Sequence, residues 1–182
     1  MKNNFTKHLV LAALFVALGM LLPFLTGQIP QIGSMMLPMH IPVLLCGMIC
    51  GWKYGAAVGF VVPLLRSVTF GMPGLFPTAV AMAFELAAYG LIIGLVYALF
   101  RRQNMAAIYV SLVAAMIGGR VVWGIVMLAL MGASGGAFTW TAFMAGAFLN
   151  AIPGIVLQLV LIPVIMVALD RTGVMKFRKA TV

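Results

Sequence analysis

Long apolar segments follow one another along the whole chain, separated by short breaks that contain glycine, proline or charged residues. None of the segments alternates apolar and polar residues in steps of two, as the strands of an outer-membrane barrel do. A helix needs about 20 apolar residues to cross a bilayer, or fewer where neighbouring helices shelter it. The pattern therefore predicts six membrane-spanning helices, at residues 8–26, 38–51, 54–70, 77–100, 105–131 and 140–170.

The breaks between the segments are of two kinds. Residues 51–55, between the second and third segments, leave room only for a tight hairpin. The breaks after the first, third and fifth segments contain glycine or proline and carry no charge; they are residues 26–39, 71–76 and 132–139. Because proline and glycine end helices, we expect these three breaks to form ordered loops at one face of the membrane.

The composition excludes a soluble globular domain. Hydrophobic residues make up 65% of the 182 residues and charged residues 7%, and the mean hydropathy is +1.21. A chain of this kind has too few polar side chains to cover a water-facing surface. Residues 1–182 are therefore expected to form a single all-α integral membrane domain.

The charges indicate how this domain is oriented. The formal net charge is +9, and nine of the eleven basic residues fall on the side opposite the three uncharged loops. These nine are Lys2, Lys7, Lys53, Arg101, Arg102, Arg171, Lys176, Arg178 and Lys179. By the positive-inside rule both termini are cytoplasmic and the three loops lie at the outer face. Membrane topology thus accounts for the basic character, and no nucleic-acid partner is expected.

Three charged residues remain in the interior of the predicted spans: Arg66, Glu85 and Arg120. A charge at the centre of a bilayer costs about 2.5 to 3.5 kcal/mol on insertion scales, so it usually faces a cavity or an opposite charge. At about 1.5 Å per residue, Glu85 and Arg120 lie roughly 12 to 17 Å below the outer ends of their helices and could meet. Asn150 reaches the same level, whereas Arg66 and His40 lie nearer the outer ends.

Two interpretations of these charges stay open. Glu85 and Arg120 could form a buried ion pair that only orients the fourth and fifth helices. Alternatively, they line an outward-facing pocket for a small polar molecule, and two arginines against one acid favour an anionic group such as a carboxylate. Arg66 lies only four residues from Phe70 and could instead extend to the outer headgroups.

Further residues near this level are weaker candidates for the same pocket. His40 stands between prolines and could simply satisfy the backbone of its loop. Tyr89 and Trp123 lie about one turn from Glu85 and Arg120, where they would form an aromatic wall, although single aromatic residues in membrane helices are usually ordinary packing.

The sequence gives little support for a metal site, a redox site or a catalytic site. Cys46 and Cys50 lie one turn apart in an apolar stretch without nearby ligands, which favours a buried structural role over a metal or redox site. There is no phosphate-binding loop, no His-Glu-x-x-His motif and no nucleophile elbow. We therefore expect no catalytic residues, metal or cofactor, and no enzyme activity.

The first predicted helix carries small residues four positions apart, at Ala13 and Ala17. Such a pair lets another helix approach closely in lipid. The approaching helix could belong to this chain or to a partner protein.

The chain resembles the substrate-binding S components of energy-coupling factor (ECF) vitamin transporters. The resemblance rests on its size, on six helices with cytoplasmic ends, on Ala13-x-x-x-Ala17, and on residues 37–47, 63–67 and 83–90. The last three stretches are similar to S components of the pantothenate-type branch.

This resemblance implies a function. Members bind a vitamin or vitamin precursor at the outer face of the bacterial plasma membrane. They associate there with a transmembrane coupling subunit and two cytoplasmic ATPases, which use the ATP. It also implies that Ala13 and Ala17 contact the coupling subunit and that the first loop acts as a gate. By position, Arg66, Glu85, Arg120 and Asn150 become candidates for substrate binding.

Alternatives remain open for both the substrate and the class of protein. Pantothenate is favoured, because its carboxylate, amide and hydroxyl groups suit the candidate residues, but nicotinate, riboflavin, a pyridoxine-like compound or a pyrimidine precursor would keep the family. A stand-alone secondary transporter would take up its substrate without ATPases, and a structural membrane protein would bind no small ligand.

Overall fold

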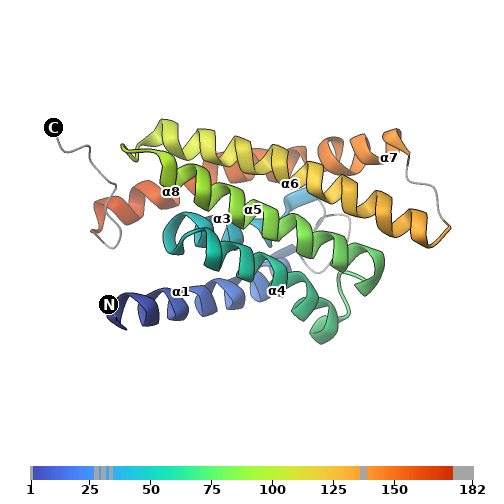
Figure 1. Cartoon of the computed structure of the whole chain (residues 1–182), viewed down its shortest axis with the longest axis horizontal. Coiled ribbons are helices and arrows are strands. Elements are labelled where there is room, and N and C mark those ends of the chain that lie inside the picture. Colours follow the sequence, from blue (N-terminus) through green and yellow to red (C-terminus); the bar gives the residue numbers. More distant parts are fainter. Residues whose placement is uncertain (1, 27–28, 30–31, 33–34, 136–138, 174–182) are drawn as a thin grey trace.

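The computed structural model describes residues 2–26, 29, 32, 35–135 and 139–173, and within them the chain forms helices and turns without any strand (Figure 1). The helical elements are α1 (Lys2–Leu21), the 3-10 helix η1 (Leu22–Thr26), α3 (His40–Cys50), α4 (Trp52–Phe70), the π-helix η2 (Leu75–Ala79), α5 (Val80–Leu99), α6 (Met105–Ala133), α7 (Trp140–Met144), the π-helix η3 (Ala145–Leu149) and α8 (Ile152–Arg171). Parts of the predicted loops 26–39 and 132–139, as well as Lys176, Arg178 and Lys179, lie outside the described residues.

Each of the six predicted segments coincides with helix, and four helical stretches are long and apolar enough to cross a membrane. These four are Phe5–Leu25, Leu75–Leu99, Met105–Ala133 and Ile152–Arg171. The other two segments differ from them. Helix α3 has 11 residues and is about 16 Å long, roughly half the thickness of the hydrocarbon core. Helix α4 has 19 residues but includes Lys53 and Arg66. The six-span topology therefore stays a prediction at α3 and α4.

Two connections differ from the prediction. Helices α3 and α4 are joined by the single residue Gly51, whose φ of 92° favours glycine. The sixth segment, predicted as one helix over residues 140–170, forms α7 and η3, which are continuous, and then α8 after a turn at Asn150 and Ala151. Pro153 explains this break, because it has no N–H to donate to the carbonyl of Leu149.

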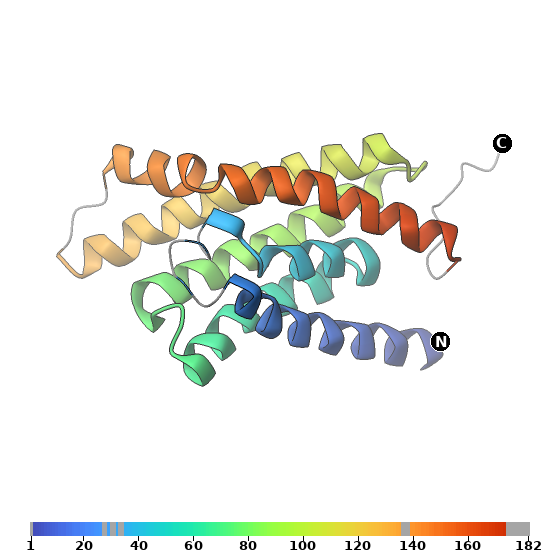
Figure 2. The same ribbon diagram turned by 180° about the vertical axis from the view of Figure 1, so that it is seen from behind.

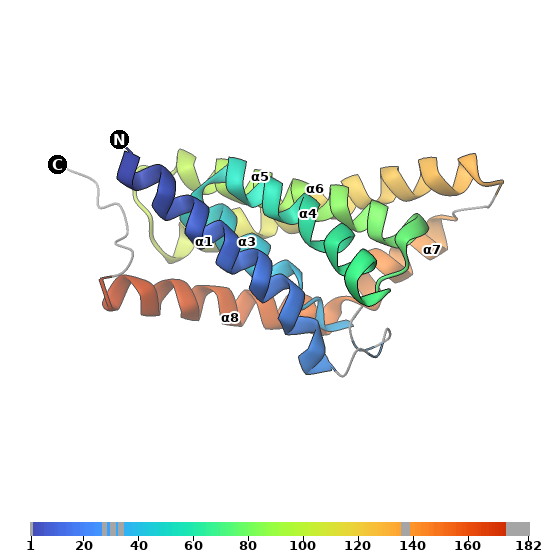
Figure 3. The ribbon, with the colours of Figure 1, turned by 90° about the horizontal axis from the view of Figure 1, so that it is seen from below.

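The short helix α3 lies at the centre of the bundle. It packs against α1, α4, α5 and α8, and all of its residues except Ile49 are buried. Figure 1 shows α5 running between α4 and α6, and Figures 2 and 3 show α3 enclosed between α1 and α8. Apart from His40 the helix is apolar, which suits it to burial on every side.

Glycines bring the backbones of α4 and α5 into contact. A Cβ atom at Gly59 would lie 2.2 Å from the carbonyl oxygen of Leu86, and one at Gly90 would lie 2.2 Å from the carbonyl carbon of Gly55. In lipid the hydrophobic effect does not drive helices together. Close packing at small residues is therefore a main source of attraction between membrane helices. These glycines therefore fix how α4 and α5, and the residues they carry, are placed.

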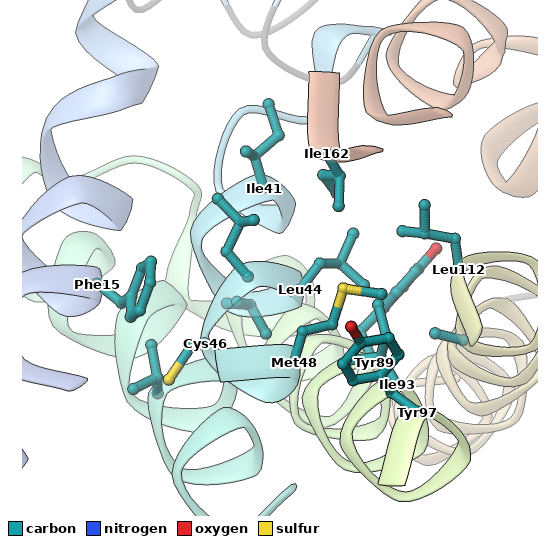
Figure 4. Packing of buried hydrophobic residues seen from close by; sticks show 14 of the residues in the cluster. Phe15, Ile41, Leu44, Cys46, Met48, Tyr89, Ile93, Tyr97, Leu112 and Ile162 are labelled. Atoms are coloured by element: carbon teal, nitrogen blue, oxygen red, sulfur yellow. The ribbon is translucent and has the colours of Figure 1, made fainter. Parts of the chain in front are cut away.

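The apolar core is built by side chains from α1, α3, α4, α5, α6 and α8 (Figure 4). Phe15 of α1, Leu44 of α3, Ile93 of α5, Leu112 of α6 and Ile162 of α8 belong to one buried cluster. The core therefore holds together helices that are distant in sequence.

The outer faces of the helices are apolar as well. Large hydrophobic side chains are exposed along each of the long helices, for example Val68, Leu99, Ile125 and Val164. Exposed apolar area of this extent is unfavourable in water and is stable in lipid. The chain is thus a multi-pass membrane protein.

Charged ends of the elements gather at one end of the bundle. The start of α1, the α3–α4 and α5–α6 connections and the end of α8 lie toward the same side in Figures 1 and 2. They carry Lys7, Lys53, Arg101, Arg102 and Arg171. The separation of charge expected from the sequence is therefore present in the fold, while the cytoplasmic orientation of that end stays a prediction.

Candidate functional site

A carboxylate from α5 joins two basic side chains in the interior of the bundle. Arg120 of α6 donates through Nη1 to Oε1 of Glu85 at 2.8 Å, and Nε2 of His40, the first residue of α3, lies 3.5 Å from the same oxygen. The three residues are 1% to 4% exposed. Glu85 and Arg120 therefore do meet, and α3 begins beside them.

Tyr89 completes this cluster. It lies one turn after Glu85 on α5, and its ring stands edge-on to the His40 ring with the centroids 5.0 Å apart. The ring also covers Gly119 of α6, where a Cβ atom would lie 2.4 Å from it. Of the seven residues proposed for the pocket, the structure thus brings together four. We refer to these as the polar cluster; they are His40, Glu85, Tyr89 and Arg120.

The cluster leaves hydrogen-bonding capacity unused among the described residues. Nε and Nη2 of Arg120 and Nδ1 of His40 are buried and have no hydrogen-bond partner. Buried polar atoms are nearly always paired, and an unpaired one costs about 1 to 3 kcal/mol. Nε and Nη2 form one edge of the guanidinium, and such an edge can bind a carboxylate through two parallel hydrogen bonds. The ion pair with Glu85 uses only the remaining nitrogen, Nη1.

Arg66 has different partners. Its guanidinium donates to the carbonyl oxygen of Met20, near the end of α1, and lies 5.0 Å and 5.2 Å from the ring centroids of Phe24 and Phe70. The residue is 2% exposed. It therefore satisfies one of the last carbonyls of α1, which have no partner within their own helix. This geometry attaches the end of α1 to α4 and does not bring Arg66 to the polar cluster.

We expect Arg66→Met to lower stability and to leave ligand affinity within about twofold of the wild type. The lost hydrogen bond from a charged donor and the lost cation–π contacts correspond to about 1.5 to 3 kcal/mol. Thermal unfolding in detergent and calorimetric titration measure the two effects separately. Unchanged stability together with a tenfold loss of affinity would return Arg66 to the ligand site.

Trp123 contacts an aromatic residue of α7, and Asn150 lies at the surface. Trp123 is half-buried and stacks on Phe143, with the ring centroids 6.2 Å apart, and Phe143 in turn contacts Trp140. Asn150 lies in the turn between η3 and α8, and its side chain is exposed. Of the two aromatic residues predicted for the wall of the pocket, Tyr89 contacts His40, and the place of Trp123 in the wall stays a prediction.

The face of α1 that carries the small residues is turned outward. Ala13 and Ala17 are exposed, whereas Ala12, Phe15 and Gly19 are buried. Gly19 lies against Val62 of α4. The other helices of the chain thus pack on a different face of α1, and Ala13 and Ala17 are free to contact lipid or another protein.

Gln158 is a buried polar residue that was not among the predicted candidates. Gln158 of α8 is 1% exposed, and its amide nitrogen Nε2 has no hydrogen-bond partner among the described residues. Gln158 is one of two uncharged amides in the predicted segment 140–170. The sequence analysis considered only the other one, Asn150, because it lies at the level of Glu85 and Arg120.

Comparison with known proteins gives one match. A family model described as "ECF transporter, substrate-specific component" matches residues 7–166. No curated protein and no solved structure matches the chain.

Proposed function

Since the chain belongs to the family of ECF transporter substrate-specific components, we propose that it binds pantothenate at the outer face of the bacterial plasma membrane. Uptake then takes place together with an ATP-driven module, made of a transmembrane coupling subunit and two cytoplasmic ATPases. The chain itself is a transport subunit and hydrolyses no ATP.

The proposed substrate class is argued from the edge of Arg120 that has no hydrogen-bond partner. Arg120 and Glu85 neutralise each other, and Nε and Nη2 of Arg120 remain free to donate to one carboxylate. This arrangement favours acids such as pantothenate or nicotinate over riboflavin or pyridoxine, which have no carboxylate. Among the acids, pantothenate also offers an amide and two hydroxyl groups to the neighbouring polar atoms.

Calorimetric titration of the purified full-length chain tests this proposal. We expect saturable binding of pantothenate. The alcohol in which CH₂OH replaces the pantothenate carboxylate should bind at least about 100-fold more weakly, because charge-assisted bidentate hydrogen bonds are lost. Nicotinate, riboflavin and pyridoxine serve as competitors. Equal affinity for the acid and its alcohol would contradict the role of Arg120, and tighter binding of another vitamin would replace pantothenate within the same family.

A further inference from the structure

We propose that Gln158 of α8 is a specificity-determining residue of this site and that its amide Nε2 donates to a carbonyl oxygen of the ligand. The proposal rests on the function proposed above and extends it. The ligand class it names is a small carboxylic acid that carries an amide or another carbonyl group beyond the carboxylate.

The position of Gln158 follows from the buried stripe of α8. Gly154, Gln158, Ile162 and Met166 are all buried and follow one another every four residues, so they share one face of the helix. This face packs against α3 and α6. Gln158 therefore points into the bundle and away from lipid.

The two neighbours of Gln158 on this stripe determine its level. Gly154 packs on the segment before α3, where a Cβ atom would lie 2.6 Å from the carbonyl oxygen of Met35. Ile162 belongs to the core cluster that includes Leu44 of α3 (Figure 4). His40 lies between Met35 and Leu44 along the chain, just as Gln158 lies between Gly154 and Ile162. Gln158 is thus placed beside the start of α3, whose first residue, His40, belongs to the polar cluster.

The unused polar atoms near the start of α3 are complementary to such a ligand. Arg120 offers two donors on one edge, Gln158 offers the donor Nε2, and Nδ1 of His40 is an acceptor when Nε2 carries the proton toward Glu85. A buried amide without a partner is unfavourable for the ligand-free protein. The same amide discriminates strongly in favour of a ligand that supplies the missing acceptor.

A cycle of one variant and one ligand analogue tests the proposal. Gln158→Met keeps the length of the side chain and removes its donor. Binding of pantothenate should weaken about tenfold. Binding of the analogue in which CH₂–CH₂ replaces the amide CO–NH should change by less than about twofold. This analogue has no amide carbonyl to accept a hydrogen bond from Gln158, so the variant removes no interaction with it.

Thermal unfolding of the ligand-free protein separates this role from plain packing. Removal of an unpartnered buried amide should leave the melting temperature unchanged or raise it. A lower melting temperature combined with equal losses of affinity for both ligands would show that Gln158 only packs α8, and would overturn the proposal. So would unchanged binding of pantothenate.

The two proposals fail in different ways. If the wild-type chain does not bind pantothenate, the proposed substrate is wrong, and the role of Gln158 falls with it before any variant is made. If the wild type binds pantothenate and Arg120→Lys weakens binding while Gln158→Met does not, only the inference about Gln158 is overturned.

Discussion

Replacement of Arg120 by lysine is expected to weaken pantothenate binding about 100-fold while the protein still folds. Lysine keeps the positive charge beside Glu85, so the buried carboxylate retains a partner. It has no planar fork, and the two parallel hydrogen bonds to a ligand carboxylate are lost. Calorimetric titration measures the affinity, and thermal unfolding in detergent verifies the fold.

Arg120→Met provides a less clean comparison, because it leaves Glu85 buried and unpaired. Loss of one partner of a buried ion pair costs about 3 to 5 kcal/mol. The double variant Arg120→Met with Glu85→Gln removes both charges and should regain most of that stability without regaining binding. If Arg120→Lys binds pantothenate as the wild type does, the ion pair only orients α5 and α6 and forms no part of the ligand site.

Substitution of tryptophan at both Ala13 and Ala17 is expected to abolish assembly with the coupling subunit and to spare ligand binding. Both residues are exposed on α1, on a face that the chain does not use for its own packing. A large side chain is tolerated there in lipid but prevents the close approach of another helix. Co-purification of the coupling subunit from membranes and titration with pantothenate measure the two properties.

Leu18→Trp is the matched control for this double variant. Leu18 is also exposed on α1, but it lies about 100° around the helix from Ala17. It should leave assembly intact. Normal assembly of the Ala13→Trp/Ala17→Trp variant would place the partner surface elsewhere on the chain.

The helices and the central ion pair could be predicted because they depend on the length of the apolar segments and on the positions of the charges along them. An apolar segment of sufficient length must form a helix in lipid, where every backbone group needs an internal partner. The depth of Glu85 and Arg120 along their segments then showed that the two could meet, and their distance of 2.8 Å confirms it. The prediction needed no knowledge of how the helices cross.

The partner of Arg66 could not be predicted, because it is a backbone atom that becomes available only in the fold. Helix α1 changes into a 3-10 turn at Leu22, where Pro23 has no N–H to continue the helix. The carbonyl of Met20 then accepts from the arginine of a distant helix. The positions of the charges along the chain do not indicate this contact.

The break in the sixth segment and the burial of Gln158 were not predicted, for a related reason. Hydropathy averaged over a long segment hides a single proline or a single amide. Pro153 ends the hydrogen-bond ladder locally, and Gln158 becomes notable only once its burial and its unpartnered nitrogen are known. Interrupted helices also occur in secondary transporters. The break in the sixth segment therefore does not distinguish uptake driven by ATP from uptake by a secondary transporter, and a transport measurement is needed.

Uptake of labelled pantothenate into vesicles tests the central claim most directly. The wild-type chain is reconstituted alone or with the coupling subunit and both ATPases, with and without ATP inside the compartment that holds the ATPases. We predict accumulation only when the complete module and ATP are present, and none with the Ala13→Trp/Ala17→Trp variant. Accumulation by the chain alone, without ATP, would contradict the account and identify a secondary transporter.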